Sequence, residues 1–155
     1  GIPELAPKNV RVLDECERML RAGEPPPLVV IHCPVEGFAV EAADSIREFT
    51  LICEYAGEVD ALHGRAFGKS DSLMDLVWTG DVATSLVVDA DRYCNASRFV
   101  NGVNNYEDKS HLKINVRSLR AAVEGEVRIF LVANRHIAKG ERLYYDYNGR
   151  RWRGR

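Results

Sequence analysis

Residues 140–148 read GERLYYDYN, a block that opens with a glycine and carries tyrosines at positions 144, 145 and 147. Taken alone, a tyrosine-rich strand belongs to a core or an interface more often than to a catalytic site. Three segments upstream read EGFAV at 36–40, EYAGE at 54–58 and RFVNGVNN at 98–105. Each of them is also ambiguous by itself, because glycine turns, edge strands and asparagine-rich loops have ordinary structural uses. The order of the four segments along the chain is more informative about function than any one of them alone.

The chain around these segments begins with a predicted amphipathic helix over residues 8–22. Leu13, Cys16 and Leu20 fall at positions i, i+3 and i+7, which places them on one face. Gly23 suits the C-terminal end of this helix, and the prolines at 25–27 prevent its continuation.

The remainder of the chain predicts mainly short strands. Apolar, β-branched runs indicate strands at 28–31, 38–40, 50–59, 84–90 and 127–133. A more helical, mixed stretch is predicted for 60–78, and the asparagine-rich residues 98–110 predict a loop. This pattern excludes a doubly wound α/β fold and indicates a small β-rich domain with one leading helix.

Composition and charge restrict the classes of molecule that this chain is expected to bind. The 155 residues fit one domain, and the net charge is −2. Four of the 21 basic residues are arginines at 150, 151, 153 and 155, so the body carries 17 basic against 23 acidic side chains, a net −6. An acidic body attracts basic peptides and argues against direct sequence-specific DNA binding. The longest apolar run, residues 28–31, is too short to cross a membrane, and no signal peptide is expected.

The four cysteines predict neither a metal site nor a disulfide framework. They lie far apart, with no CxxC or CxC pair, at positions 16, 33, 53 and 94. Apolar or helical neighbours surround each of them, so we expect buried free thiols in a reducing, intracellular compartment.

Read together and in order, the four segments resemble the SET-domain family of protein lysine methyltransferases. Its motifs are a GxG-like turn, EYxGE, RFxNHxxxPN and a GEELxYDY block, and the resemblance covers roughly residues 28–149. The forms PVEGFAVEA, RFVNGVNN and GERLYYDYNG are most similar to plant trithorax-related enzymes that monomethylate the lysine at position 27 of histone H3.

This resemblance implies a β-rich α+β fold of several short antiparallel sheets, with a threaded, knot-like C-terminal segment and one leading helix. Residues 1–27 would form an N-terminal helical leader. Residues 28–149 would form the SET domain, with a variable insert at 61–85, and residues 150–155 would form a basic tail. The segments around Asn101 and Tyr147 are then expected to meet at one site.

The resemblance also implies residue roles. The cofactor S-adenosyl-L-methionine, which leaves as S-adenosyl-L-homocysteine, would bind at nine positions: Gly37, Phe38, Ala39, Tyr55, Arg98, Phe99, Asn101, Gly102 and Tyr147. The substrate would contact Glu54, Glu58, Tyr144 and Tyr145. Tyr147 and Tyr145 would be catalytic. Tyr147 would orient the lysine amine, and a tyrosine at 145 would fill the space that a second methyl group needs.

Three departures from the family pattern affect these expectations. Ala39 stands where glycine is common, and its small side chain still permits close backbone approach. Gly102 replaces the family's histidine and leaves main-chain contacts there. No cysteine-rich zinc segment follows the tyrosine block, so another element must cover the lysine channel: the C-terminus with Trp152, the substrate or a partner subunit.

The resulting functional hypothesis is a histone-lysine N-methyltransferase that acts in the nucleus on the histone H3 tail or the nucleosome. Two alternatives stay open at this point. The same chemistry could serve another histone lysine or a non-histone protein, or the chain could be a catalytically inactive SET-like binding module. The sequence makes no prediction of oligomeric state.

Overall fold

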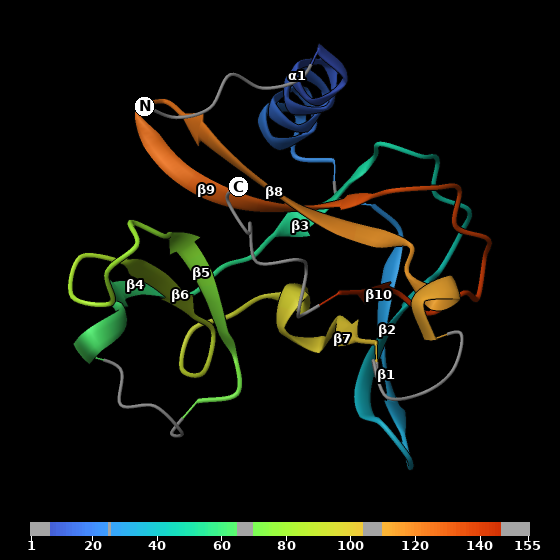
Figure 1. The fold of residues 1–155 in the computed structure, drawn as a ribbon. Coiled ribbons are helices and arrows are strands. Elements are labelled where there is room, and N and C mark those ends of the chain that lie inside the picture. The colour runs from blue at the N-terminus through green and yellow to red at the C-terminus, as the bar shows by residue number, and fades with distance from the viewer. Residues whose placement is uncertain (1–6, 25, 65–69, 104–109, 147–155) are drawn as a thin grey trace.

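The computed structural model describes residues 7–24, 26–64, 70–103 and 110–146. In this part of the chain, one α-helix and four small sheets are arranged around two hydrophobic clusters (Figure 1). The elements are α1 (Pro7–Ala22), β1 (Leu28–Cys33), β2 (Gly37–Ala42), β3 (Leu51–Glu54), β4 (Glu58–Ala61), β5 (Leu73–Val77), β6 (Leu86–Asp89), β7 (Asn101–Gly102), β8 (Val116–Val123), β9 (Glu126–Ala133) and β10 (Tyr144–Tyr145), with 3-10 turns η1 (Leu62–Gly64), η2 (Ala96–Phe99) and η3 (Ser110–Lys113).

The sheets are β1-β2, β3-β9-β8, β4-β6-β5 and β10-β7. All their strand pairs are antiparallel except β10 with β7, which is parallel. The predicted β-rich fold with short antiparallel sheets and one leading helix is therefore confirmed.

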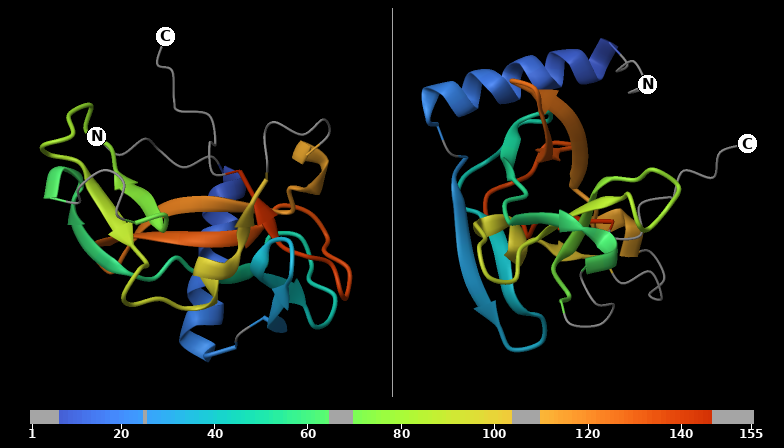
Figure 2. Two further views of the ribbon diagram at one scale, coloured as in Figure 1. Left: turned by 90° about the horizontal axis from the view of Figure 1, so that it is seen from below. Right: turned by 90° about the vertical axis from the view of Figure 1, so that its left-hand side faces the viewer.

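Helix α1 covers the outer face of the sheet β3-β9-β8 (Figure 2). Its buried side chains are Val12, Cys16 and Met19, and they pack against Leu51, Leu119, Ala121, Val123, Phe130 and Val132. The predicted residues Leu13, Cys16 and Leu20 all pack at this interface, but Leu13 and Leu20 are only partly buried, so the centre of the buried face is shifted by about one position. Both the predicted and the observed buried face include Cys16. The spacing of apolar residues alone does not distinguish two helix faces that differ by a small rotation about the helix axis.

The C-terminal end of α1 follows the prediction. Gly23 adopts φ +64°, and its N–H donates to the Leu20 carbonyl at 3.2 Å, while the Glu24 N–H donates to the Met19 carbonyl at 3.3 Å. This is a Schellman motif, which satisfies the last helical carbonyls and needs a residue that tolerates positive φ. No helix in the described residues is long and apolar enough to span a membrane.

Strand β9 lies in the centre of the molecule. Its residues from Ile129 to Ala133 are all buried, because α1 covers one face and the main core covers the other. Covering on both faces explains why this strand is a continuous apolar run rather than an alternating one. The prediction of a strand at 127–133 is confirmed.

Strand β8 was missed by the sequence-based prediction. It forms a hairpin with β9 in which Val123 pairs with Glu126, and the two turn residues, Glu124 and Gly125, have φ +53° and +83°. Two positive values make a type I′ turn, whose twist matches that of the flanking strands. The glycine after Glu124 was the available signal for this hairpin.

The predicted helical stretch at 60–78 was wrong. In the described part, β4 ends at Ala61, a short 3-10 turn follows, and residues 73–77 form β5; residues 65–69 lie outside the described residues. In β5, Met74 and Leu76 are buried while Asp75 between them is exposed, which is the period of two that a strand requires. The predicted strand at 50–59 is divided into β3 and β4.

Gly57 lies at this division, against the end of β6. A Cβ at this position would lie 2.3 Å from the carbonyl oxygen and 2.6 Å from the carbonyl carbon of Asp89. These are backbone atoms of a paired strand, which cannot move aside as a flexible side chain would. The glycine of the EYAGE segment is thus required by close packing between β3, β4 and β6.

Gly57→Ala is expected to lower the free energy of unfolding by about 2 to 3 kcal/mol, because the added methyl group overpacks the backbone. Gly23→Ala is the control, since a Cβ at Gly23 meets no atom within 4 Å. It should cost only about 1 kcal/mol, from its positive φ. Urea unfolding of both variants measures the difference, and equal losses would contradict the packing explanation.

Candidate active site

The first motif segment contains the last residue of the turn between β1 and β2 and the first four residues of β2. Gly37 has φ +73°, and a Cβ there would meet no atom within 4 Å, so this position needs glycine for its backbone conformation and not for space. Ala39 is buried, whereas Phe38 is 55% exposed. The turn therefore presents an aromatic ring beside accessible backbone.

The first and third segments meet at Phe38. Its ring contacts the Phe99 ring with centroids 5.4 Å apart, and the side-chain amide of Asn101 donates to the Phe38 carbonyl at 3.3 Å. The His32 ring also contacts the Phe38 ring, in an edge-on arrangement with centroids 5.4 Å apart. A glycine turn and an asparagine segment separated by more than sixty positions in the chain thus form one surface.

The fourth segment runs beside both of them. Residues 140–143 bond to β2, with the Leu143 N–H donating to the Val40 carbonyl at 2.9 Å. Next, β10 pairs in parallel with β7, with Tyr144 opposite Asn101 and Tyr145 opposite Gly102. The predicted meeting of the asparagine and tyrosine segments is confirmed for these residues. Tyr147 itself lies outside the described residues.

Asn95 and Arg98 hold the third segment in place. The Asn95 side chain accepts from the Ser97 N–H at 2.9 Å and donates to the Glu54 carbonyl at 2.8 Å. The Arg98 guanidinium donates to the carbonyls of Ala90 and Asp91, at 3.2 Å and 2.6 Å. Arg98 therefore stabilises the connection from β6 to the Asn101 segment.

Tyr55 lies in the core. It is 4% exposed, and its hydroxyl donates to the Ser72 carbonyl at 2.9 Å. This contact ties the residue just before β5 to the EYAGE segment. The geometry indicates a supporting role behind the surface formed by Phe38 and Asn101.

Glu54 and Glu58, both predicted substrate contacts, have different surroundings. The Glu54 carboxylate forms a two-pronged ion pair with Arg128 on β9, with Nε donating at 2.8 Å and Nη2 also donating. Glu58 lies half-buried in β4, opposite Asp89 of β6. The carboxylate of Glu54 is therefore already neutralised by an internal partner.

Tyr144, a third predicted substrate contact, takes part in a polar cluster that the motifs did not reveal. Its hydroxyl donates to the Glu36 carboxylate at 3.0 Å, and Arg142 donates to the same carboxylate at 2.7 Å. Partial burial, with the nearby Glu36 carboxylate, raises the pKa of the Tyr144 hydroxyl. Arg142 also lies 3.4 Å from Glu41. These contacts join the turn before Gly37 to the tyrosine block.

The cysteines form no pairs and are not uniformly buried. Cys16 and Cys33 are buried, Cys53 is intermediate and Cys94 is exposed, so the expectation of burial was wrong for Cys94. Burial raises the pKa of Cys16 to about 11 and that of Cys53 to about 12. The described residues contain no cluster of histidine, cysteine and acidic side chains that could hold a metal ion.

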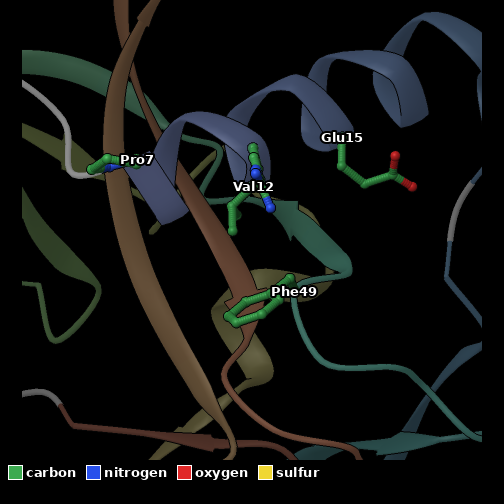
Figure 3. A pocket seen from close by; sticks show the side chains of 5 residues that line it. Pro7, Val12, Glu15 and Phe49 are labelled. Carbon is green, nitrogen blue, oxygen red and sulfur yellow. The ribbon is translucent and has the colours of Figure 1, made fainter.

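A pocket of about 510 Å³ lies apart from these segments, between α1 and Phe49 (Figure 3). Its lining consists of Pro7, Arg11, Val12, Glu15 and Phe49. None of these belongs to the predicted site. The candidate active site is instead the surface where β2, β7 and β10 meet.

Comparison with known proteins agrees with this arrangement. Residues 37–148 match the family model described as SET domain. Histone-lysine N-methyltransferase ATXR5 from Arabidopsis thaliana is 45% identical over 149 residues, which are 96% of this chain and 39% of the relative. Histone-lysine N-methyltransferase ATXR6 from the same plant is 45% identical over 150 residues, 96% of this chain and 43% of the relative. The chain spans about two fifths of these relatives.

A solved structure shows the same fold. The crystal structure of ATXR5 in complex with histone H3.1 mono-methylated on arginine 26 is similar with a TM-score of 0.83 at 44% sequence identity, covering 96% of this chain and 69% of that chain. The family model covers most of the chain, including three of the four motif segments in full and the first from Gly37 onward. This chain belongs to the SET-domain family.

Proposed function

We propose that this chain is the catalytic domain of a histone-lysine N-methyltransferase that transfers one methyl group from S-adenosyl-L-methionine to the lysine at position 27 of histone H3. The observation that carries the proposal is the meeting of Phe38, Asn101 and Tyr145 through β2, β7 and β10. Similarity to ATXR5 and ATXR6, and to an ATXR5 complex with histone H3.1, supports the reaction class, the H3 partner and a nuclear, chromatin location.

The residues at this surface fit the cofactor in kind. The exposed ring of Phe38 beside Phe99 offers an apolar face for an adenine ring. Asn101 offers a side-chain amide, and the backbone at Gly37, where a Cβ would meet no atom within 4 Å, is open to close approach by the amino-acid end. When bound, S-adenosyl-L-methionine supplies a methyl group activated by a positive sulfonium. Arg98 and Tyr55 would keep these groups in position.

The lysine amine must lose its proton before it can attack, because its ordinary pKa is about 10.4. A narrow apolar channel next to a positive charge disfavours the ammonium form, and the proton leaves to solvent. Tyr145, which is 4% exposed, would form one wall of this channel. The Tyr147 hydroxyl would orient the neutral amine for in-line displacement.

Charge supports a basic peptide as substrate. From residue 58 to residue 91 the sequence carries seven acidic side chains and two basic ones, Arg65 and Lys69. Its described residues include the sheet β4-β6-β5 (Figure 1). A field of this sign raises the rate at which a histone tail encounters the site, and salt weakens it.

The test of the function uses radiolabelled S-adenosyl-L-methionine with core histones and nucleosomes, followed by mass spectrometry of the labelled lysine. The expected product is one methyl group on the lysine at position 27 of histone H3. Tyr147→Phe is the control: it should bind S-adenosyl-L-homocysteine in calorimetry but lose most of its turnover, because the amine is no longer oriented.

Each other outcome corrects the proposal at a defined point. Label on a different lysine or protein would retain the chemistry and reject the substrate. Cofactor binding without any label would reject the enzyme and favour a binding module. Near-normal turnover of Tyr147→Phe would remove Tyr147 from the mechanism.

Tyr145→Phe is expected to convert the monomethyl product into a mixture rich in dimethyl-lysine, because loss of the hydroxyl leaves room for a methylated amine. The fold should survive, since a single buried hydroxyl contributes only about 1 kcal/mol. Tyr144→Phe removes the neighbouring hydroxyl, which contacts Glu36, and should leave the product ratio unchanged. An unchanged ratio in Tyr145→Phe, measured by mass spectrometry, would show that Tyr145 does not limit methylation.

A double-mutant cycle separates two roles for Glu54. If its carboxylate serves the fold through Arg128, Glu54→Ala and Arg128→Ala should each reduce stability, with a coupling energy of about 1 kcal/mol. Neither variant should then change the KM for the H3 peptide by more than about twofold. A large rise in KM for Glu54→Ala alone, with no coupling in urea unfolding, would instead support direct contact with the substrate.

A further inference from the structure

Asn115 is a fully buried polar residue that none of the motifs includes. It lies between the 3-10 turn η3 and β8, and it is 0% exposed. A buried side-chain amide destabilises a fold unless its donors and acceptor are all satisfied. The partners of this amide therefore indicate what Asn115 does.

Within the described residues, the hydrogen-bond partners of the Asn115 side chain lie in the tyrosine block, residues 140–148. The Asn115 side-chain nitrogen donates to the Arg142 carbonyl at 2.7 Å and to the Glu141 carboxylate at 3.1 Å. Its side-chain oxygen accepts from the Tyr144 N–H at 2.9 Å. Its backbone N–H donates to the Tyr144 carbonyl at 3.1 Å. One residue thus binds both backbone groups of Tyr144.

The strand held in this way is too short to fix its own register. Strand β10 contains two residues and pairs with two residues of β7. Tyr144 is half-buried and faces Glu36, whereas Tyr145 is buried. Because side chains alternate along a strand, a slip by one residue would exchange these two environments. An external contact that recognises one particular residue prevents the slip.

We propose that Asn115 is a positioning residue for methyl transfer, which fixes the register of Tyr144–Tyr145 against Asn101–Gly102 and so places Tyr145 where it limits the number of methyl groups added. The inference rests on the proposed function. Asn115 acts through Tyr144 and touches neither substrate nor cofactor. The side-chain amide suits the task because it offers two donors and an acceptor at one point, which neither a carboxylate nor a hydroxyl can do.

The primary test compares Asn115→Asp with wild type in two independent measurements. Aspartate keeps the shape and the acceptor but loses both donors, and its charge faces the Glu141 carboxylate. The second aspartate oxygen would face two acceptors, the Arg142 carbonyl and the Glu141 carboxylate, so the side chain should turn away and release the Tyr144 N–H. In hydrogen exchange followed by NMR, the Tyr144 amide should then exchange at least about tenfold faster, while the Leu131 amide in β9 should not change. With H3 peptide, kcat should fall roughly 10- to 100-fold, and the dimethyl-lysine share of the product should rise.

Two further variants keep the test decisive. Asn115→Ser, which retains one hydrogen-bonding group, replaces the aspartate variant if that protein does not fold, and it should show the same changes to a smaller extent. Val123→Ala, at the opposite end of β8 under α1, loses core packing without touching the tyrosine block. It should keep the wild-type exchange at Tyr144 and the wild-type product ratio.

A folded Asn115 variant with wild-type exchange at Tyr144 and a wild-type product ratio would overturn the proposal. The same changes in Val123→Ala would also overturn it, because they would then follow from lower stability alone. Failure of the proposed function is recognised separately, since the wild-type protein would then transfer no methyl group to any histone.

Discussion

The parallel pairing of Tyr144–Tyr145 with Asn101–Gly102 is the contact on which the proposed site depends. It brings together segments more than forty residues apart and is too short to be stable alone, since chain closure over that length costs several times what two residues of pairing return. Contacts with the rest of the fold provide the additional stabilisation that this pairing needs. Residues 140–143 bond to β2, Asn115 binds Tyr144 from the other side, and Val103 bonds to the Tyr145 carbonyl at 3.0 Å.

The hydrophobic core consists of two clusters, and only one of them contains residues of the proposed site. One cluster joins α1 to the outer face of β3-β9-β8, and the other joins the opposite face to β2, β5, β6 and β10. Strand β9 is buried on both faces and separates the two clusters. Changes under α1 should therefore affect stability first, whereas changes near Tyr145 should affect stability and activity together.

Local patterns predicted α1, its end at Gly23 and most strands, because helix ends and β-branched runs depend on neighbours in sequence. They failed where contacts between residues distant in sequence determine the secondary structure. Strand β5 was predicted as helix, and β8, whose apolar positions alternate irregularly, was missed. The meeting of the segments around Asn101 and Tyr147 was expected only from the family resemblance. Asn115 and the Glu36–Arg142 pair carried no recognisable local signal, since their partners lie 26 to 106 positions away. Gly57 was visible as a motif residue, but its reason, contact with Asp89, was not.

The most direct test of the account is titration of isotope-labelled protein with S-adenosyl-L-homocysteine, followed by the amide signals in NMR spectra. If β2, β7 and β10 form one cofactor site, the amides of Phe38, Asn101, Gly102 and Tyr145 should shift together with a single dissociation constant, and those of Val12 and Cys16 in α1 should not. Saturable binding that shifts α1 and Phe49 instead, or no saturable binding at all, would contradict the assignment of the site.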